Sequence, residues 1–347
     1  MNSAQQNPAA NQLGAGVTDD QVRGAVERSG YPLQTIVAEI LKSKFHVQQE
    51  WCYVDRDSKE LRAIDLHARR MLHDWGTGPQ PRVRPHLDLL VECKQSQLPY
   101  VFFLSDGKPA SLDSPEIVGL RHLNIEIATD DDSSTYSWSL ISALDLNMDD
   151  FQKVPPYSST FSKCVRKGAE IELSGTEAYA GFVLPLIKAL HHFRVAKHPV
   201  QTAWYFDARM VITLAVLDAP MIAVSFEDQT TTLTLTPWVR ALRHEYVEEA
   251  EQWERDHVWT VDIIHKDFLT TYVEAHALPF AQRFSDRVLK HATELATGKG
   301  FVRGMGKDPW SAVESRLSKR PPAARVGRTK LFLQNLARLL SSRKSEE

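Results

Sequence analysis

The sequence predicts an α/β fold, with a mixed sheet of four or five strands flanked by helices. Two observations favour it. Short apolar runs bounded by turn residues gather between residues 47 and 104, directly after an amphipathic helical pattern. A second helical pattern, at residues 177–195, precedes two further apolar runs within residues 210–226. Because helices that alternate with apolar strands cover the faces of one sheet, both groups are expected in a single α/β domain.

Each predicted element follows from a local pattern. Thr18 and the two acids after it favour a helix start, and residues 33–45 place their apolar side chains at helical spacing. An Asp-Arg-Asp-Ser turn at residues 55–58 separates two strand-like runs, which predicts a hairpin. The predicted helices span residues 18–28, 33–45, 177–195, 268–295 and 330–340, and the predicted strands span residues 47–54, 60–68, 87–94, 100–104, 210–217, 221–226 and 258–264.

The composition is that of a globular protein. Of the 347 residues, 43% are apolar and 24% are charged, which excludes a disordered, collagen-like or disulfide-scaffold chain. Three cysteines are too few and too widely spaced for a zinc ribbon or a disulfide framework. The first 20 residues lack the pattern of a signal peptide, and the most apolar stretch, residues 211–224, contains an Asp and a Pro. We therefore expect a cytoplasmic protein that does not enter a membrane.

Charge is distributed unevenly along the chain. Residues 297–347 hold 12 Lys or Arg and 4 Asp or Glu, whereas residues 1–296 hold 29 and 40, a net charge of 29 − 40 = −11. The sequence thus predicts a flexible leader at residues 1–17, an acidic domain at residues 18–296, and a basic tail that ends in a helix. Residues 105–172 of the domain, which are polar and carry no motif, are expected to be an insertion. The tail is expected either to contact nucleic acid or to dock on the acidic domain and stabilise the fold or a homodimer.

The segment that carries chemistry is residues 61–94. Alternate residues of a strand point to opposite faces, so Glu92 and Lys94 share one face at the end of an apolar strand. Asp65 lies in the preceding strand between two apolar residues. An acid and an amine in such surroundings cost free energy unless they bind something, such as a cation together with an anionic substrate. Two carboxylates from adjacent strands can hold one hard divalent cation.

The acid-x-Lys triplet has little specificity by itself. The composition predicts about two such triplets by chance, and the chain holds three, at residues 57–59, 92–94 and 106–108. Only residues 92–94 end an apolar strand and follow a strand with an isolated Asp. The prediction of a cation site therefore rests on the two adjacent strands with their acids, and not on the triplet alone.

Two segments resemble a known superfamily. Residues 60–68 read Glu-Leu-Arg-Ala-Ile-Asp-Leu-His-Ala, and residues 90–96 read Leu-Val-Glu-Cys-Lys-Gln-Ser. Together with the helix before them they resemble the restriction-endonuclease-like PD-(D/E)XK nucleases, in which an Asp and an (Asp/Glu)-x-Lys lie on adjacent core strands. The resemblance covers about residues 30–104, although Ile64 replaces the Pro of the motif and Ala63 stands where many relatives have Glu. It implies a restriction-endonuclease-like core and metal-dependent hydrolysis of phosphodiester bonds, with DNA as the expected partner.

The resemblance also implies a role for each residue. Asp65 and Glu92 would bind Mg²⁺ or Mn²⁺, with the backbone carbonyl of Cys93 as a further ligand. Lys94 would orient or help to deprotonate the attacking water and offset charge in the transition state. Glu39 would add a carboxylate from the helix, and Gln95 would position water or phosphate.

Structural roles compete with each of these assignments. Asp65 could pair with Arg62 or Arg69, and Glu92 could form a structural ion pair with Lys94. The first rival function is a catalytically silent nuclease-like fold that acts as an interaction module. The second is a nucleic-acid-binding protein whose basic tail is the functional surface, and binding that needs no metal would favour it.

Overall fold

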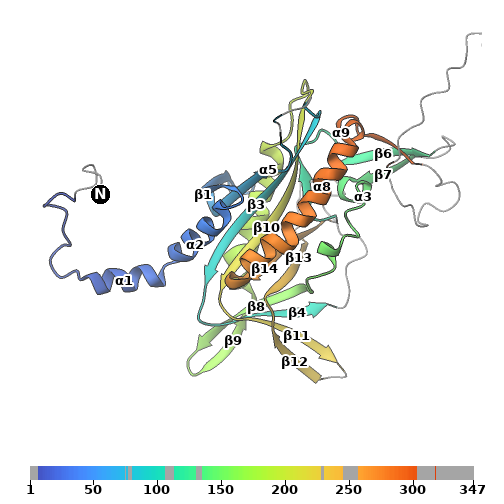
Figure 1. Ribbon diagram of the computed structural model, residues 1–347. Helices are drawn as coiled ribbons and strands as arrows, with labels where there is room; N and C mark the ends of the chain where they lie inside the picture. The colour runs from blue at the N-terminus through green and yellow to red at the C-terminus, as the bar shows by residue number, and fades with distance from the viewer. Residues whose placement is uncertain are drawn as a thin grey trace, which may run out of the picture.

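A computed structural model describes residues 7–74, 76, 80–105, 113–129, 135–227, 230–244, 257–302 and 317 of the chain. The fold is α/β as predicted, with helices against a large mixed sheet (Figure 1). The sheet is larger than the predicted four or five strands, since 12 of the described strands join it in the order β1-β2-β3-β10-β14-β13-β8-β4-β11-β12, with β5 against β10 and β9 against β8. A separate sheet of 3 strands has the order β15-β6-β7.

The described part of the chain contains helices and strands with the following bounds. The helices are α1 (Asp19–Arg28), α2 (Tyr31–Lys42), α3 (Leu140–Ala143), α4 (Gly175–Ala178), α5 (Leu184–Ala196), α7 (Leu269–Thr271), α8 (Leu278–Lys290) and α9 (Ala292–Thr297), with 3₁₀ or π segments η2 (Asp150–Gln152), η3 (Tyr179–Val183), η4 (Lys266–Phe268) and η5 (Tyr272–Ala277). The strands of the first half are β1 (His46–Val54), β2 (Leu61–Met71), β3 (Val83–Gln95), β4 (Tyr100–Ser105), β5 (Glu116–Val118), β6 (Asn124–Thr129), β7 (Thr135–Ser139) and β8 (Tyr157–Lys167). The strands that follow are β9 (Glu170–Ser174), β10 (Phe206–Asp218), β11 (Met221–Glu227), β12 (Thr230–Leu235), β13 (Trp238–His244), β14 (Val258–His265) and β15 (Lys299–Val302).

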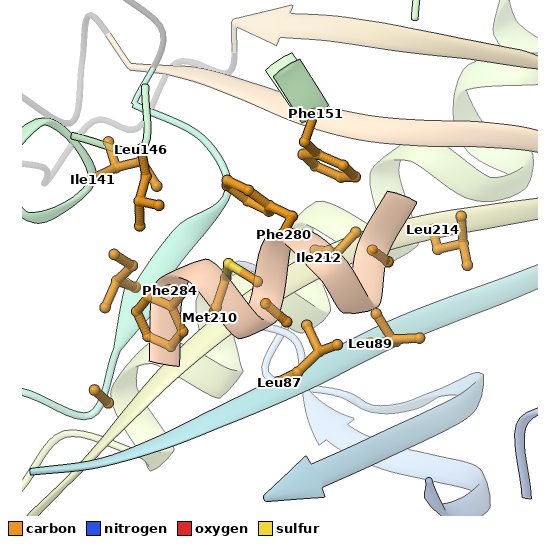
Figure 2. Packing of buried hydrophobic residues seen from close by; sticks show 14 of the residues in the cluster. Leu87, Leu89, Ile141, Leu146, Phe151, Met210, Ile212, Leu214, Phe280 and Phe284 are labelled. Carbon is orange, nitrogen blue, oxygen red and sulfur yellow. The ribbon is translucent and has the colours of Figure 1, made fainter. Parts of the chain in front are cut away.

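One part of the sheet positions the candidate site. The strands β1, β2 and β3 form an antiparallel meander, and β10 runs parallel to β3 over its whole length. The helix α5 precedes β10 and buries its apolar residues against one face of this sheet, around Leu90 and Val211. The helix α8 covers the opposite face, where Phe280 and Phe284 lie over Leu87 and the neighbouring apolar residues of β3 and β10 (Figure 2). Because both faces are covered, β3 and β10 read as nearly continuous apolar runs.

The segment predicted to be an insertion, residues 105–172, contributes strands to both sheets where it is described. It supplies β8, which pairs with β4 and β13, and β5, which pairs with β10. These strands carry too few apolar residues to be recognised by periodicity alone.

The structure describes part of the predicted leader and part of the predicted basic tail. Residues 7–17 of the predicted leader are exposed and contain no helix or strand. At the other end, β15 lies within the predicted tail, pairs with β6, and buries Phe301 and Val302. Leu317 is also buried, so the fold continues past residue 297. The predicted helix at residues 330–340 lies outside the described residues. Among the residues that the structure describes, no helix is long and apolar enough to cross a membrane.

Candidate active site

The strand β2 separates from β3 at Asp65. Pairing between the two strands ends at Leu66 and Val91, and the side-chain alternation of β2 changes there, because Ile64 belongs to the core cluster that contains α5 while Leu66 belongs to the cluster of the opposite face, with α2 and α8. The Asp65 carboxylate takes the place of the missing strand partner: its Oδ2 accepts a hydrogen bond of 2.6 Å from the backbone N–H of Cys93. The Asp65 carboxylate therefore lies in the gap between the strands, attached to β2 and hydrogen-bonded to β3.

Glu92 lies beside Asp65 on the face of β3 that α5 covers. It is only 4% exposed, and a side-chain hydrogen bond joins it to Asp65. Its Oε2 also lies 3.0 Å from Nζ of Lys94. Burial and the charge of Asp65 raise the pKa of Glu92 to about 8, although Lys94 opposes the shift. At neutral pH the pair of acids therefore shares a proton instead of carrying two negative charges.

The pKa values of the two neighbouring groups are raised as well. Burial raises the pKa of Asp65, and the carboxylate of Glu50 adds to the shift, while the Cys93 N–H and Lys94 oppose it. Burial lowers the pKa of Lys94, but the charge of Glu92, its hydrogen bond and the charge of Asp65 together outweigh burial, so that the pKa of Lys94 lies above its usual value. Lys94 is thus an ammonium group at neutral pH.

Two residues that the sequence did not single out belong to the site. Gln34 of α2 is buried, and its Nε2 donates to Oε1 of Glu50 at 2.8 Å and to the carbonyl oxygen of Asp65 at 3.0 Å. The β1–β2 register sets Glu50 opposite Asp65, at a positive φ of 50° that a Glu seldom adopts. A polar residue on the apolar face of the helix could have indicated Gln34. The proximity of Glu50 depends on strand register, and no sequence signal marks it.

Glu39 and Gln95 do not join the acids and the lysine. The side chain of Glu39 is 64% exposed and pairs with Lys42 at 2.5 Å. The residues of α2 that face the sheet are Leu33, Gln34, Val37, Ala38 and Leu41, which leaves Glu39 on the outer side of the helix. Gln95 is exposed at the last position of β3, and the alternation of the strand directs it away from the face of Glu92 and Lys94.

Of the two ion pairs proposed as structural alternatives, the structure contains the pair of Glu92 with Lys94 and not the pair of Asp65 with Arg62. Arg62 pairs with Asp55 at 3.0 Å and with Glu60 at 3.3 Å, and not with Asp65. The Glu92–Lys94 pair does exist, but it lies in a buried site with a second acid. Both the structural and the catalytic interpretation of that pair therefore remain compatible with its geometry.

The donor set fits a hard divalent cation. No group of three or more His, Cys, Asp or Glu side chains in the described part of the chain is arranged to hold a metal ion. Two carboxyl groups, however, share a proton in a buried site, and a cation could replace that proton. The N–H and C=O of one residue in an extended strand point to the same edge, so the Cys93 carbonyl faces the Asp65 side. One or two carboxylates completed by water are typical of Mg²⁺ sites.

A second polar cluster lies farther along the same face. Nε2 of His67 lies 2.7 Å from Oδ1 of Asp88, and Arg209 donates to Oδ2 of Asp88 at 3.1 Å. All three side chains are buried. Because these groups satisfy one another, we interpret His67 as structural.

Comparisons with protein-family models, with curated proteins and with solved structures found no match for this chain. The function proposed next is therefore derived from the side chains of the site and from the resemblance of the two short segments.

Proposed function

We propose that the protein is a metal-dependent nuclease of the PD-(D/E)XK type, which hydrolyses phosphodiester bonds of DNA with Mg²⁺ or Mn²⁺. The observation that carries this proposal is the convergence of Asp65, Glu92 and Lys94 at the point where β2 leaves β3. The succession of α2, β1, β2, β3, α5 and β10 would form the restriction-endonuclease-like core. Nucleic acid is the expected partner.

Asp65, Glu92 and the carbonyl oxygen of Cys93 would hold the metal ion. When bound, the ion would lower the pKa of a coordinated water and polarise the scissile phosphate. The pKa of Glu92, about 8, supports metal binding at this point, because a carboxyl group that holds a proton at neutral pH is stabilised by added positive charge. Glu50 adds a further negative charge beside Asp65. Without a cation these acids would repel the phosphates of a nucleic acid, so binding as well as hydrolysis should require metal.

Lys94 would act on the substrate. Its side chain is 36% exposed, so the ammonium group can reach a phosphate while it remains 3.0 Å from Glu92. Hydrolysis would form a bond from the water oxygen to phosphorus and break the bond from phosphorus to the leaving oxygen, while the attacking water loses a proton to solvent and the leaving oxygen takes up a proton from solvent. Because Lys94 already carries its proton at neutral pH, it would orient the water and offset the charge of the transition state, and would not accept a proton.

The test is cleavage of linear, circular and single-stranded DNA and of RNA, in Mg²⁺, in Mn²⁺ and in EDTA. Cleavage of DNA in both metals and none in EDTA is expected. Lys94→Ala should fold normally and lose about 100-fold or more of the rate, the usual effect of removing a transition-state group. Lys42→Ala is the matched control, because Lys42 forms an exposed pair with Glu39 outside the site.

Two outcomes would contradict the proposal. Unchanged cleavage by Lys94→Ala would refute the assignment of this site. Binding of nucleic acid in EDTA without cleavage of any substrate would favour the rival function, a catalytically silent fold that binds nucleic acid.

A further inference from the structure

The loop between α5 and β10 exposes two large aromatic residues. Trp204 is 64% exposed and Tyr205 is 51% exposed. Aromatic side chains of this size are usually buried, and their exposure side by side is typical of a contact surface. The loop lies far along the chain from Asp65 and Glu92, and neither aromatic residue contributes to the candidate active site.

Arg82 covers one side of Trp204. Its Cζ lies 4.0 Å from the centroid of the Trp204 ring, and its Nε donates to the carbonyl oxygen of Trp204 at 3.1 Å. A hydrogen bond and a cation–π contact therefore fix the ring in one orientation. The exposed fraction of Trp204 shows that much of the ring remains open to a ligand.

A second guanidinium group, from a different segment of the chain, binds the same loop. Arg121 donates to the carbonyl oxygens of Gln201 at 2.8 Å and Ala203 at 3.1 Å. Neither Arg82 nor Arg121 forms an ion pair with any carboxylate that the structure describes. Both arginines are held by neutral carbonyl groups, so their positive charges are available to an anion.

Other positive groups lie around this loop, in a domain whose net charge is negative. The carboxylate of Asp207, just beyond the loop, is already paired with Arg84 at 2.6 Å and Arg209 at 3.1 Å. Beside the loop, Arg56 and Arg194 line a cavity of about 230 Å³, and Arg194 pairs with Glu116 at 4.0 Å. Because Arg84, Arg194 and Arg209 are paired with carboxylates, the charges that can attract a polyanion here are those of Arg82, Arg121 and Arg56.

We propose that Trp204, Arg82 and Arg121 form a binding platform for a single-stranded segment of nucleic acid. An unpaired base would stack on the open side of Trp204, and the guanidinium groups would contact the flanking phosphates. Stacking suits every base, because each has an aromatic face, so the platform would bind without sequence preference. A base within a duplex cannot reach the ring, which makes single strands the expected ligand. This inference rests on the proposed function for its substrate class.

The platform lies at a defined distance from the candidate active site. The strand β3 runs from Val83, next to Arg82, to Glu92. Nine residue steps at about 3.3 Å each make this distance about 30 Å. A strand stacked as in a duplex rises about 3.4 Å per nucleotide, so about nine stacked nucleotides span this distance, and an extended single strand spans it with fewer. An oligonucleotide of about three nucleotides is too short to occupy both places even when it is extended.

The test measures dissociation constants by fluorescence anisotropy, with Mg²⁺ present and in the Lys94→Ala background so that no cleavage occurs. Trp204→Ala should weaken binding of a single strand of about 20 nucleotides by about five- to hundredfold. Binding of a blunt duplex of equal length should change less than about twofold, and Trp204→Phe should retain most of the affinity because it keeps a stacking ring. Arg82→Ala should weaken binding and flatten its dependence on salt. Phe226→Ala is the matched control, since Phe226 is 61% exposed on a different strand.

The outcomes separate the platform from the nuclease assignment. Unchanged single-strand affinity in Trp204→Ala would overturn the platform, whether or not cleavage depends on Lys94. Equal losses on single strands and duplexes would overturn it as well, because stacking of an unpaired base would then not explain them. A selective loss on single strands supports the platform, even if the protein proves unable to cleave. In a strand of about three nucleotides the cleavage rate should be the same for the wild type and Trp204→Ala, since such a strand cannot reach from the active site to the ring.

Discussion

Replacing Glu92 by Gln should stabilise the protein when no divalent cation is present. Gln has the same shape as Glu but carries no charge, and its carbonyl oxygen can still accept a hydrogen bond from Lys94. In the wild type, Glu92 has a pKa of about 8 in the folded state and 4.5 as a free carboxyl group. Folding at pH 7 thus requires Glu92 to take up a proton. The 2.5 pH units between 4.5 and 7, at about 1.4 kcal/mol each, make this cost about 3 kcal/mol.

The sign of the pH dependence follows from the same values. Between pH 4.5 and pH 8 the folded protein binds more protons at Glu92 than the unfolded chain does. The free energy of unfolding of the wild type should therefore fall as pH rises through this window. Glu92→Gln lacks this dependence. The variant and the wild type should be about equally stable near pH 4.5, and the variant should be more stable at pH 7 by up to about 3 kcal/mol.

The assay is denaturant unfolding of both proteins in EDTA at several pH values between 4.5 and 8. Glu116→Gln is a control of opposite sign. Burial raises the pKa of Glu116, but the hydrogen bond from His257, at 2.8 Å, and the charge of Arg194 lower it further, to a value below the ordinary one. Glu116→Gln should therefore be destabilising above pH 4.5. A destabilised Glu92→Gln protein at pH 7 in EDTA would refute the reasoning, because Glu92 would then be the charged partner of a structural ion pair. Added Mg²⁺ should stabilise the wild type and leave Glu92→Gln nearly unchanged.

Three further predictions concern the neighbouring groups and the tail. Asp65→Asn, which keeps an acceptor for the Cys93 N–H, should be at least as stable as the wild type in EDTA and should gain little from Mg²⁺ in melting curves; marked destabilisation in EDTA with an intact metal response would support a structural role instead. Glu39→Ala should change cleavage less than about twofold, whereas Glu50→Gln should raise the Mg²⁺ concentration for half-maximal cleavage about tenfold, since Glu50 lies beside Asp65; the opposite ranking would contradict the site as described. Removal of residues 318–347, which hold eight Lys or Arg and two Glu, should weaken DNA binding and reduce its salt slope without loss of metal-induced stabilisation; equal salt slopes would exclude phosphate contacts by this segment.

The sequence by itself determined the elements around the site. Strands that are buried on both faces need apolar residues at nearly every position, so the predicted strand at residues 87–94 lies within β3 and that at residues 210–217 lies within β10. Alternation along an extended chain is a local property, and it correctly set Glu92 and Lys94 on one face, where Oε2 of Glu92 lies 3.0 Å from Nζ of Lys94.

Tertiary structure decided which elements meet. Every described position of β12 is exposed, including Leu233 and Leu235, so its apolar residues mark no buried face, and it joins the sheet only through pairing with β11. Periodicity indicates that a face is buried, but it does not indicate the register of a strand or its neighbour at the edge. For this reason no local pattern marked Glu50, which the β1–β2 register sets beside Asp65. Glu39 was implied only by the family resemblance, and it lies on the outer side of α2. The contact between Asp65 and the Cys93 N–H has the same origin, because it forms only where β2 and β3 separate, and long-range packing of the two faces fixes that point.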